Sequence, residues 1–104
     1  IFILLNEKWD FNSIASKSEM HEHIVGKILD VMVDIFESSQ KRIYIAGSLR
    51  NAGEVKTTVA RLTELHIINI VNRVVDHMDE IDDLTAYIKT ALYNSAEKIP
   101  VKRA

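Results

Sequence analysis

The sequence predicts a mostly α-helical fold, a compact four-helix domain with a small β element. Apolar residues recur at helical spacing over several long segments. The run 42–46 instead alternates and is rich in β-branched and aromatic residues, as a strand would be. Three glycines and one proline in 104 residues leave few places for a linker. We therefore expect a single domain, with a lead-in over 1–18, a helical core over 19–99 and a tail over 100–104.

The first helix is expected over 19–38, with Ser18 as its N-cap. Its apolar stripe comprises Met20, Ile24, Ile28, Val31, Met32 and Ile35. Neighbouring apolar residues widen this stripe, which is typical of a central helix packed by several neighbours. Gly26 within the stripe predicts a close approach of another helix.

The strand expected over 42–46 ends at Gly47 and needs a partner for its backbone N–H and C=O groups. Residues 1–5 are the other strand-like run. Either these two runs pair within the chain, or the strand edge pairs with another molecule. We prefer the first arrangement, a two-stranded pairing of 1–5 with 42–46.

Three further helices follow, each preceded by a residue that suits an N-cap. They are expected over 52–62 after Asn51, over 64–77 after Thr63, and over 84–98 after Asp82 or Asp83. Pro100 marks the end of regular structure.

The overall charge is nearly balanced. Thirteen basic and fifteen acidic residues give a net charge of −2, whereas a free-standing nucleic-acid-binding domain is usually basic. The absence of cysteine excludes disulfides and thiolate metal sites and fits a reducing cytoplasm. The apolar run 1–5 is too short for a signal sequence or a membrane span. Because the chain starts without methionine, we expect a trimmed chain or a piece of a longer protein.

The four histidines do not suggest a metal site. His21 and His23 are two residues apart on a helix, so their side chains point to different sides. His66 and His77 are about three helical turns apart, roughly 16 Å. We expect no bound metal.

No pattern of catalytic residues is present. The serines lie at expected caps, turns or helix ends, without a motif that would activate a nucleophile. The acidic run 76–83 suggests cation binding at first sight, but it lacks the glycine and the ligand spacing of a calcium loop. A solvated linker that ends in a helix cap is the better interpretation. The segment 47–53 lacks the lysine of a phosphate-binding loop. We expect neither enzyme activity nor a cofactor.

Basic residues gather around the strand and the helix that follows it. Candidate contacts to DNA phosphates are Arg42, Arg50, Lys56 and Arg61. The alternative, which we prefer, is that these residues only balance the charge of an acidic first helix.

The last helix has two faces with different character. One arc is apolar and suits the core, whereas Ala86, Thr90 and Tyr93 fall on the opposite side at spacing i, i+4, i+7. Either Tyr93 packs on the N-terminal segment, or the small residues let a partner helix approach and Tyr93 anchors it. The candidate partner-binding residues are Ala86, Lys89, Thr90, Tyr93 and Asn94.

Residues 24–99 resemble the C-terminal domain of RepA-type plasmid replication initiators of Gram-positive bacteria. The resemblance is carried by the stretches 28–34, 42–47, 62–67 and 86–94, the last of which is the most specific. That domain is similar in turn to the DnaD domain of helicase-loading proteins, whose final helix has the pattern Tyr-Ile-x-x-Ile-Leu-x-x-x-Trp. Tyr87, Ile88 and Leu92 match this pattern, whereas Ala91 and Ser95 depart from it.

The resemblance implies a DnaD-like fold and a non-enzymatic role in DNA replication. A separate winged-helix domain of the parent protein would recognise origin DNA. The present domain would recruit host replication proteins, such as primase, the helicase or its loader. Two alternatives stay open, an accessory DNA-binding domain and a structural domain that self-associates through an exposed strand edge.

Overall fold

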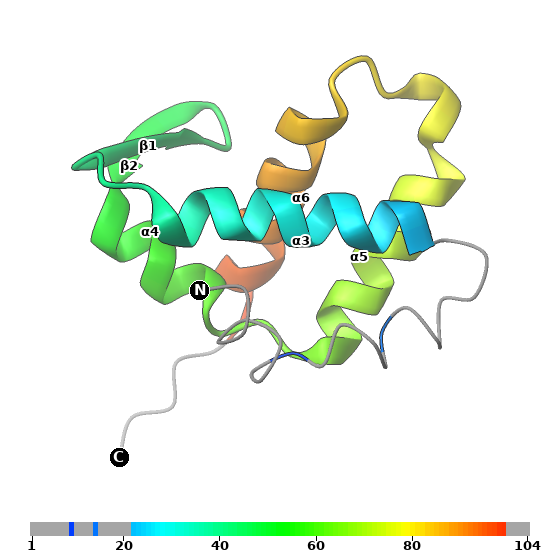
Figure 1. The fold of residues 1–104 in the computed structure, drawn as a ribbon, viewed down its shortest axis with the longest axis horizontal. Coiled ribbons are helices and arrows are strands. Elements are labelled where there is room, and N and C mark those ends of the chain that lie inside the picture. The colour runs from blue at the N-terminus through cyan, green and yellow to red at the C-terminus, as the bar shows by residue number, and fades with distance from the viewer. Residues whose placement is uncertain (1–8, 10–13, 15–21, 100–104) are drawn as a thin grey trace.

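Four α-helices and a two-stranded antiparallel sheet make up the part of the chain that the computed structural model describes, which is Trp9, Ile14 and residues 22–99. In order these are α3 (Glu22–Glu37), β1 (Arg42–Ile45), β2 (Ser48–Asn51), α4 (Ala52–Val59), α5 (Glu64–Asp76), the short 3₁₀ helix η2 (Met78–Glu80) and α6 (Leu84–Glu97) (Figure 1). The predicted fold class, mostly helical with a small β element, is confirmed.

The helices begin where the sequence predicts caps. Asn51, Thr63 and Asp83 each accept a hydrogen bond from the backbone N–H three residues on, at 3.1, 3.4 and 3.1 Å. Each bond satisfies a donor that the first helical turn would otherwise leave without a partner. The predicted cap Ser18 lies outside the described residues.

β1 and β2 form a hairpin with a two-residue turn at Ala46 and Gly47. Both turn residues have positive φ, 51° and 79°, as the tight type I′ turn requires. Ser48–Asn51, over which the sequence predicts no strand, is the strand that pairs with β1. The predicted partner, residues 1–5, lies outside the described residues.

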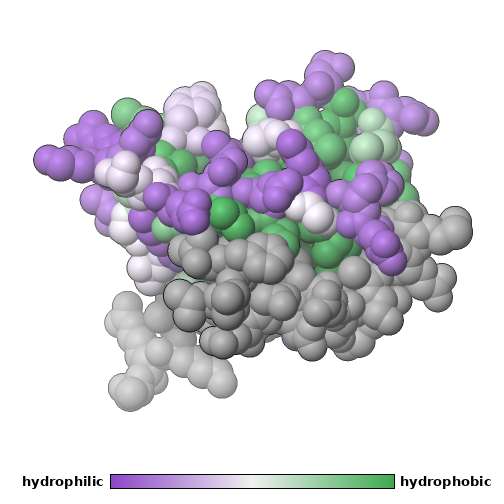
Figure 2. Space-filling view, viewed as in Figure 1, coloured by the Kyte–Doolittle hydropathy of each residue, from purple (hydrophilic) through white to green (hydrophobic). Residues whose placement is uncertain are grey.

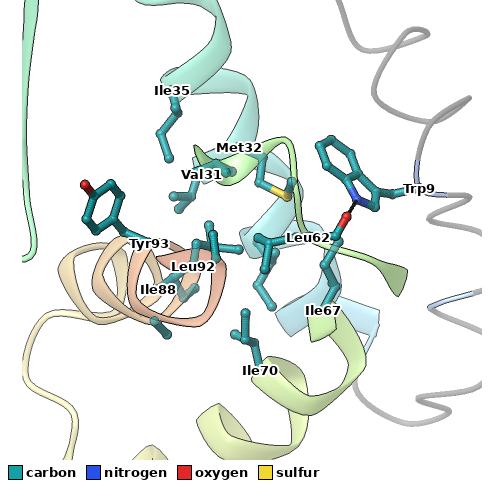
Figure 3. Close-up of a cluster of buried hydrophobic side chains, with 14 of the residues drawn as sticks. Trp9, Val31, Met32, Ile35, Leu62, Ile67, Ile70, Ile88, Leu92 and Tyr93 are labelled. Atoms are coloured by element: carbon teal, nitrogen blue, oxygen red, sulfur yellow. Dashed lines mark hydrogen bonds between the residues drawn. The ribbon is translucent and has the colours of Figure 1, made fainter. Parts of the chain in front are cut away.

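The core lies between α3 and the other helices. α3 runs across α6 and contacts α4, α5 and α6, which confirms its predicted central place (Figure 1). Figure 3 shows Val31, Met32 and Ile35 of α3 beside Ile88 and Leu92 of α6. All five side chains are buried.

Trp9 is part of this core although it precedes helices α3 to α6 in the sequence. Its side chain is 1% exposed, and its indole Nε1 donates a 2.6 Å hydrogen bond to the Leu62 carbonyl (Figure 3). Its ring also lies 6.0 Å from the ring of Phe36, centroid to centroid. The indole therefore joins α3 to the connection between α4 and α5.

Gly26 is exposed, which makes the predicted close helix approach wrong. A Cβ added at this position would have no atom within 4 Å, other than its own chain neighbours and helix backbone. No neighbouring helix therefore packs against Gly26 in the described part of the chain.

Gly26→Ala is expected to raise the free energy of unfolding by about 0.5–1 kcal/mol, because glycine loses more backbone entropy than alanine in a helix. Urea denaturation followed by circular dichroism measures this change. Gly53→Ala is the matched control. Its new Cβ would lie 3.2 Å from the capping oxygen of Asn51, a tight contact, so this variant should gain less stability than Gly26→Ala. An equal gain in both variants would contradict the expectation.

Candidate protein-binding surface

The outer face of the hairpin exposes two large apolar side chains. Along β1, Ile43 and Ile45 are buried, so the alternation of a strand turns Tyr44 outward. Tyr44 lies directly opposite Leu49 of β2, and the two side chains are 66% and 58% exposed. Such cross-strand pairs share one face of the sheet, so these two form a joint apolar surface. We call Tyr44 and Leu49 the hairpin pair.

Neither residue of the hairpin pair is among the predicted partner-binding residues. A signal for Tyr44 was present, because it alternates with two strand isoleucines. Leu49 carries no such signal, since the sequence pattern predicts no strand over Ser48–Asn51.

A groove separates the hairpin from the first half of α6. Tyr44 and Lys89 both line two adjoining cavities of about 320 and 210 Å³. Gly47, Ala86 and Thr90 also line the smaller one. Figure 2 shows the surface notched at its upper edge, between the part over the hairpin and the part over the beginning of α6. Three of the predicted partner-binding residues therefore share one groove with Tyr44, and we call it the hairpin groove.

Tyr93 does not belong to that exposed face. Its side chain is only 7% exposed, and the guanidinium of Arg50 lies 4.7 Å from the centre of its ring. Figure 3 shows its ring beside Ile88 and Leu92, with the hydroxyl directed away from them. Of the two interpretations of Tyr93, the burial of its side chain favours packing within the domain over contact with a partner, whereas Asn94 is exposed.

The reason is that the surroundings of α6 change along its length. Ala86 and Tyr93 lie on the same side of an ideal helix, two turns apart. At Ala86 that side is exposed, whereas at Tyr93 the side chain of Arg50 covers it. Helical spacing alone cannot distinguish the two positions.

Arg50 is held in place by the turn of the hairpin. Its Nε donates to the Ile45 carbonyl at 3.1 Å and its Nη2 to the Ala46 carbonyl at 3.4 Å. A guanidinium over an aromatic face is attracted by the ring's negative potential. Arg50 therefore connects the hairpin to α6.

Burial, and then the neighbouring Glu97 carboxylate, raise the pKa of Tyr93 above its ordinary value of 10.0, while the Arg50 guanidinium acts in the opposite direction. The fold thus favours the neutral phenol.

The other basic candidates do not all face solvent. Lys56 donates from Nζ to the Ser38 carbonyl at 2.8 Å, and Arg61 is half-buried beside a cavity of about 540 Å³ that Tyr93 also lines. Arg42 is exposed. Two of the four predicted DNA-contacting residues, Arg50 and Lys56, thus donate hydrogen bonds to backbone carbonyls of the domain itself.

One hydroxyl–imidazole pair has the distance that a nucleophile and its base would need. Thr63 Oγ1 lies 2.7 Å from His66 Nδ1. The same two side chains, however, bond the backbone N–H groups at the start of α5, which is the arrangement of a capping box. The pair is accounted for by the helix cap. Within the described residues, no three His, Asp or Glu side chains lie close enough together to hold a metal ion.

No protein-family model, curated protein or solved structure matched this chain. The resemblance to RepA-type domains therefore stays a prediction. Among the described helices, none has both the length and the apolar character needed to cross a membrane.

Proposed function

We propose that this chain is a non-enzymatic, protein-binding domain of a plasmid or mobile-element replication initiator. Its partners are host replication proteins, namely primase, the helicase or its loader. The resemblance to the C-terminal domain of RepA-type initiators supports the replication setting. The near-neutral charge supports protein contacts over duplex binding.

The observation that carries the binding role is the hairpin pair beside the hairpin groove. Single exposed apolar residues are common on proteins, but two large ones in register on one small sheet form a continuous surface. A tyrosine at such a place supplies a large contact area at little entropic cost. Lys89 lines the adjoining groove and adds a charged group at its edge.

Leu49→Ala is expected to weaken binding of purified host primase or helicase by about fivefold or more, the size of effect found for residues at the centre of an interface. The fold should be retained, because the Leu49 side chain is mostly exposed. Biolayer interferometry with the domain immobilised measures the affinity, and circular dichroism checks the fold.

The matched control is Leu65→Ala. Leu65 is as exposed as Tyr44, at 66%, but lies on α5. It should leave the affinity unchanged. An equal loss in both variants, or no binding of any of the three host proteins, would refute the proposed function.

A further inference from the structure

A second groove lies on the other side of the exposed face of α6. It has a volume of about 590 Å³ and is lined by Ile81, Ala86, Tyr87 and Thr90, with Glu80 and Asp82 among the polar residues at its edge. Segment 77–83 forms an arch between the end of α5 and the beginning of α6 (Figure 1), and several of its residues line the groove. Most of the groove's surface is apolar. We call it the acidic groove, for the reason given next.

Three carboxylates, those of Glu80, Asp82 and Asp83, line this apolar groove together with the imidazole of His77, whose Nδ1 lies 3.4 Å from Glu80 Oε2. Two further carboxylates, Asp76 at the end of α5 and Asp79, lie close by in the sequence, and no lysine or arginine occurs between positions 73 and 89. All five are exposed. Figure 2 shows the resulting pattern at the upper right, where hydrophobic atoms lie between hydrophilic ones.

The arrangement of these carboxylates points to an extended cationic partner. They do not converge as ligands of one ion, since no metal-holding group of acidic side chains or histidines occurs in the described part of the chain. They would also repel the phosphates of a nucleic acid. An apolar groove with spread negative charges at its edge matches a chain that offers apolar side chains and several separated positive charges.

We propose that the acidic groove binds a positively charged amphipathic segment of a partner protein. An apolar side chain of that segment enters the groove between Ile81 and Tyr87, and its lysines or arginines pair with Glu80 and Asp82. This surface is separate from the hairpin pair, and the inference does not depend on a role in replication. Ala86 and Thr90 line both grooves, so the two surfaces meet along α6.

The test uses two synthetic fluorescent peptides of about 15 residues, long enough to form a helix on binding. One peptide has leucines on one helical face and lysines on the other, and the second has glutamate in place of every lysine. Fluorescence anisotropy with the full chain measures both affinities. The lysine peptide should bind saturably and more weakly as salt is added, and the glutamate peptide should not bind.

Two double variants separate the local charges from the net charge. Glu80→Gln with Asp82→Asn should weaken binding of the lysine peptide about fivefold, the loss of two partly exposed ion pairs. Asp30→Asn with Glu37→Gln, on the exposed side of α3, changes the net charge equally and should leave the affinity unchanged. Asp83 is kept because it caps α6.

Ala86→Gln tests the groove rather than its charge. Ala86 is exposed in the first turn of α6, so a longer neutral side chain should not disturb the fold but should obstruct the groove and weaken binding several-fold. Circular dichroism checks that every variant is folded. Equal binding of the two peptides, an equal effect of the two double variants, or unchanged affinity of Ala86→Gln would overturn the proposal.

Discussion

Replacing Trp9 with alanine is expected to lower the free energy of unfolding by about 3–5 kcal/mol, the usual range for a large buried aromatic side chain. The indole is almost fully buried, packs beside Phe36 and donates its N–H to the Leu62 carbonyl. Since small domains are stable by only about 5–15 kcal/mol, this loss brings the variant close to unfolding at room temperature.

Urea denaturation followed by far-ultraviolet circular dichroism measures the effect of the Trp9 variants. Trp9→Phe is the informative companion, because it keeps an aromatic ring but leaves the Leu62 carbonyl without this donor. It should lose about 1–3 kcal/mol, the cost of an unsatisfied buried acceptor. Equal stability of Trp9→Ala and the original chain would contradict the place of the indole in the core.

Tyr93→Ala is expected to lower the free energy of unfolding by about 3 kcal/mol, because the ring is buried between α6 and Arg50. Any loss of partner binding in this variant would therefore reflect damage to the fold. Tyr93→Phe keeps the ring and its contact with the guanidinium, so its stability at neutral pH should be close to that of the original chain. If Tyr93→Ala and Tyr93→Phe are equally stable, the ring does not contribute to the core.

The pH dependence provides a second test of Tyr93. Since the pKa of Tyr93 is raised above 10.0 in the fold, its contribution to stability is fully present below pH 10.0 and is lost as the pH rises through the folded-state pKa. The stability difference between the original chain and Tyr93→Phe should therefore change in this alkaline range, in the direction that favours the phenylalanine variant. Denaturation curves between about pH 8 and pH 11 measure it. A difference that stays constant across this range would contradict the raised pKa.

The helices could be predicted well from the sequence because their signals are local. Asn51, Thr63 and Asp83 each supply an oxygen to the first turn that follows, whatever the rest of the chain does. The second strand could not be predicted in the same way. Ser48–Asn51 has one strongly apolar residue, and the turn places an alanine where asparagine or glycine is usual.

The candidate site depended on tertiary contacts, which helical spacing does not contain. Ala86 and Tyr93 share one side of α6, yet only Tyr93 lies beneath the side chain of Arg50. The predicted partner-binding set therefore divides into residues that line open grooves and one that supports the core. The hairpin pair needed knowledge of β2, because Leu49 becomes a neighbour of Tyr44 only through strand pairing.

Asn51 is at once the last residue of β2 and the cap of α4, so no linker separates the strand from the helix. The next residue, Ala52, donates its backbone N–H to the Lys41 carbonyl at 2.9 Å, which also ties this point to the chain entering β1. A partner that contacts Tyr44 or Leu49 would thus contact a hairpin that continues directly into α4. The hairpin is therefore attached to the helical body at both of its ends, through Asn51 and through the hydrogen bond between Ala52 and Lys41.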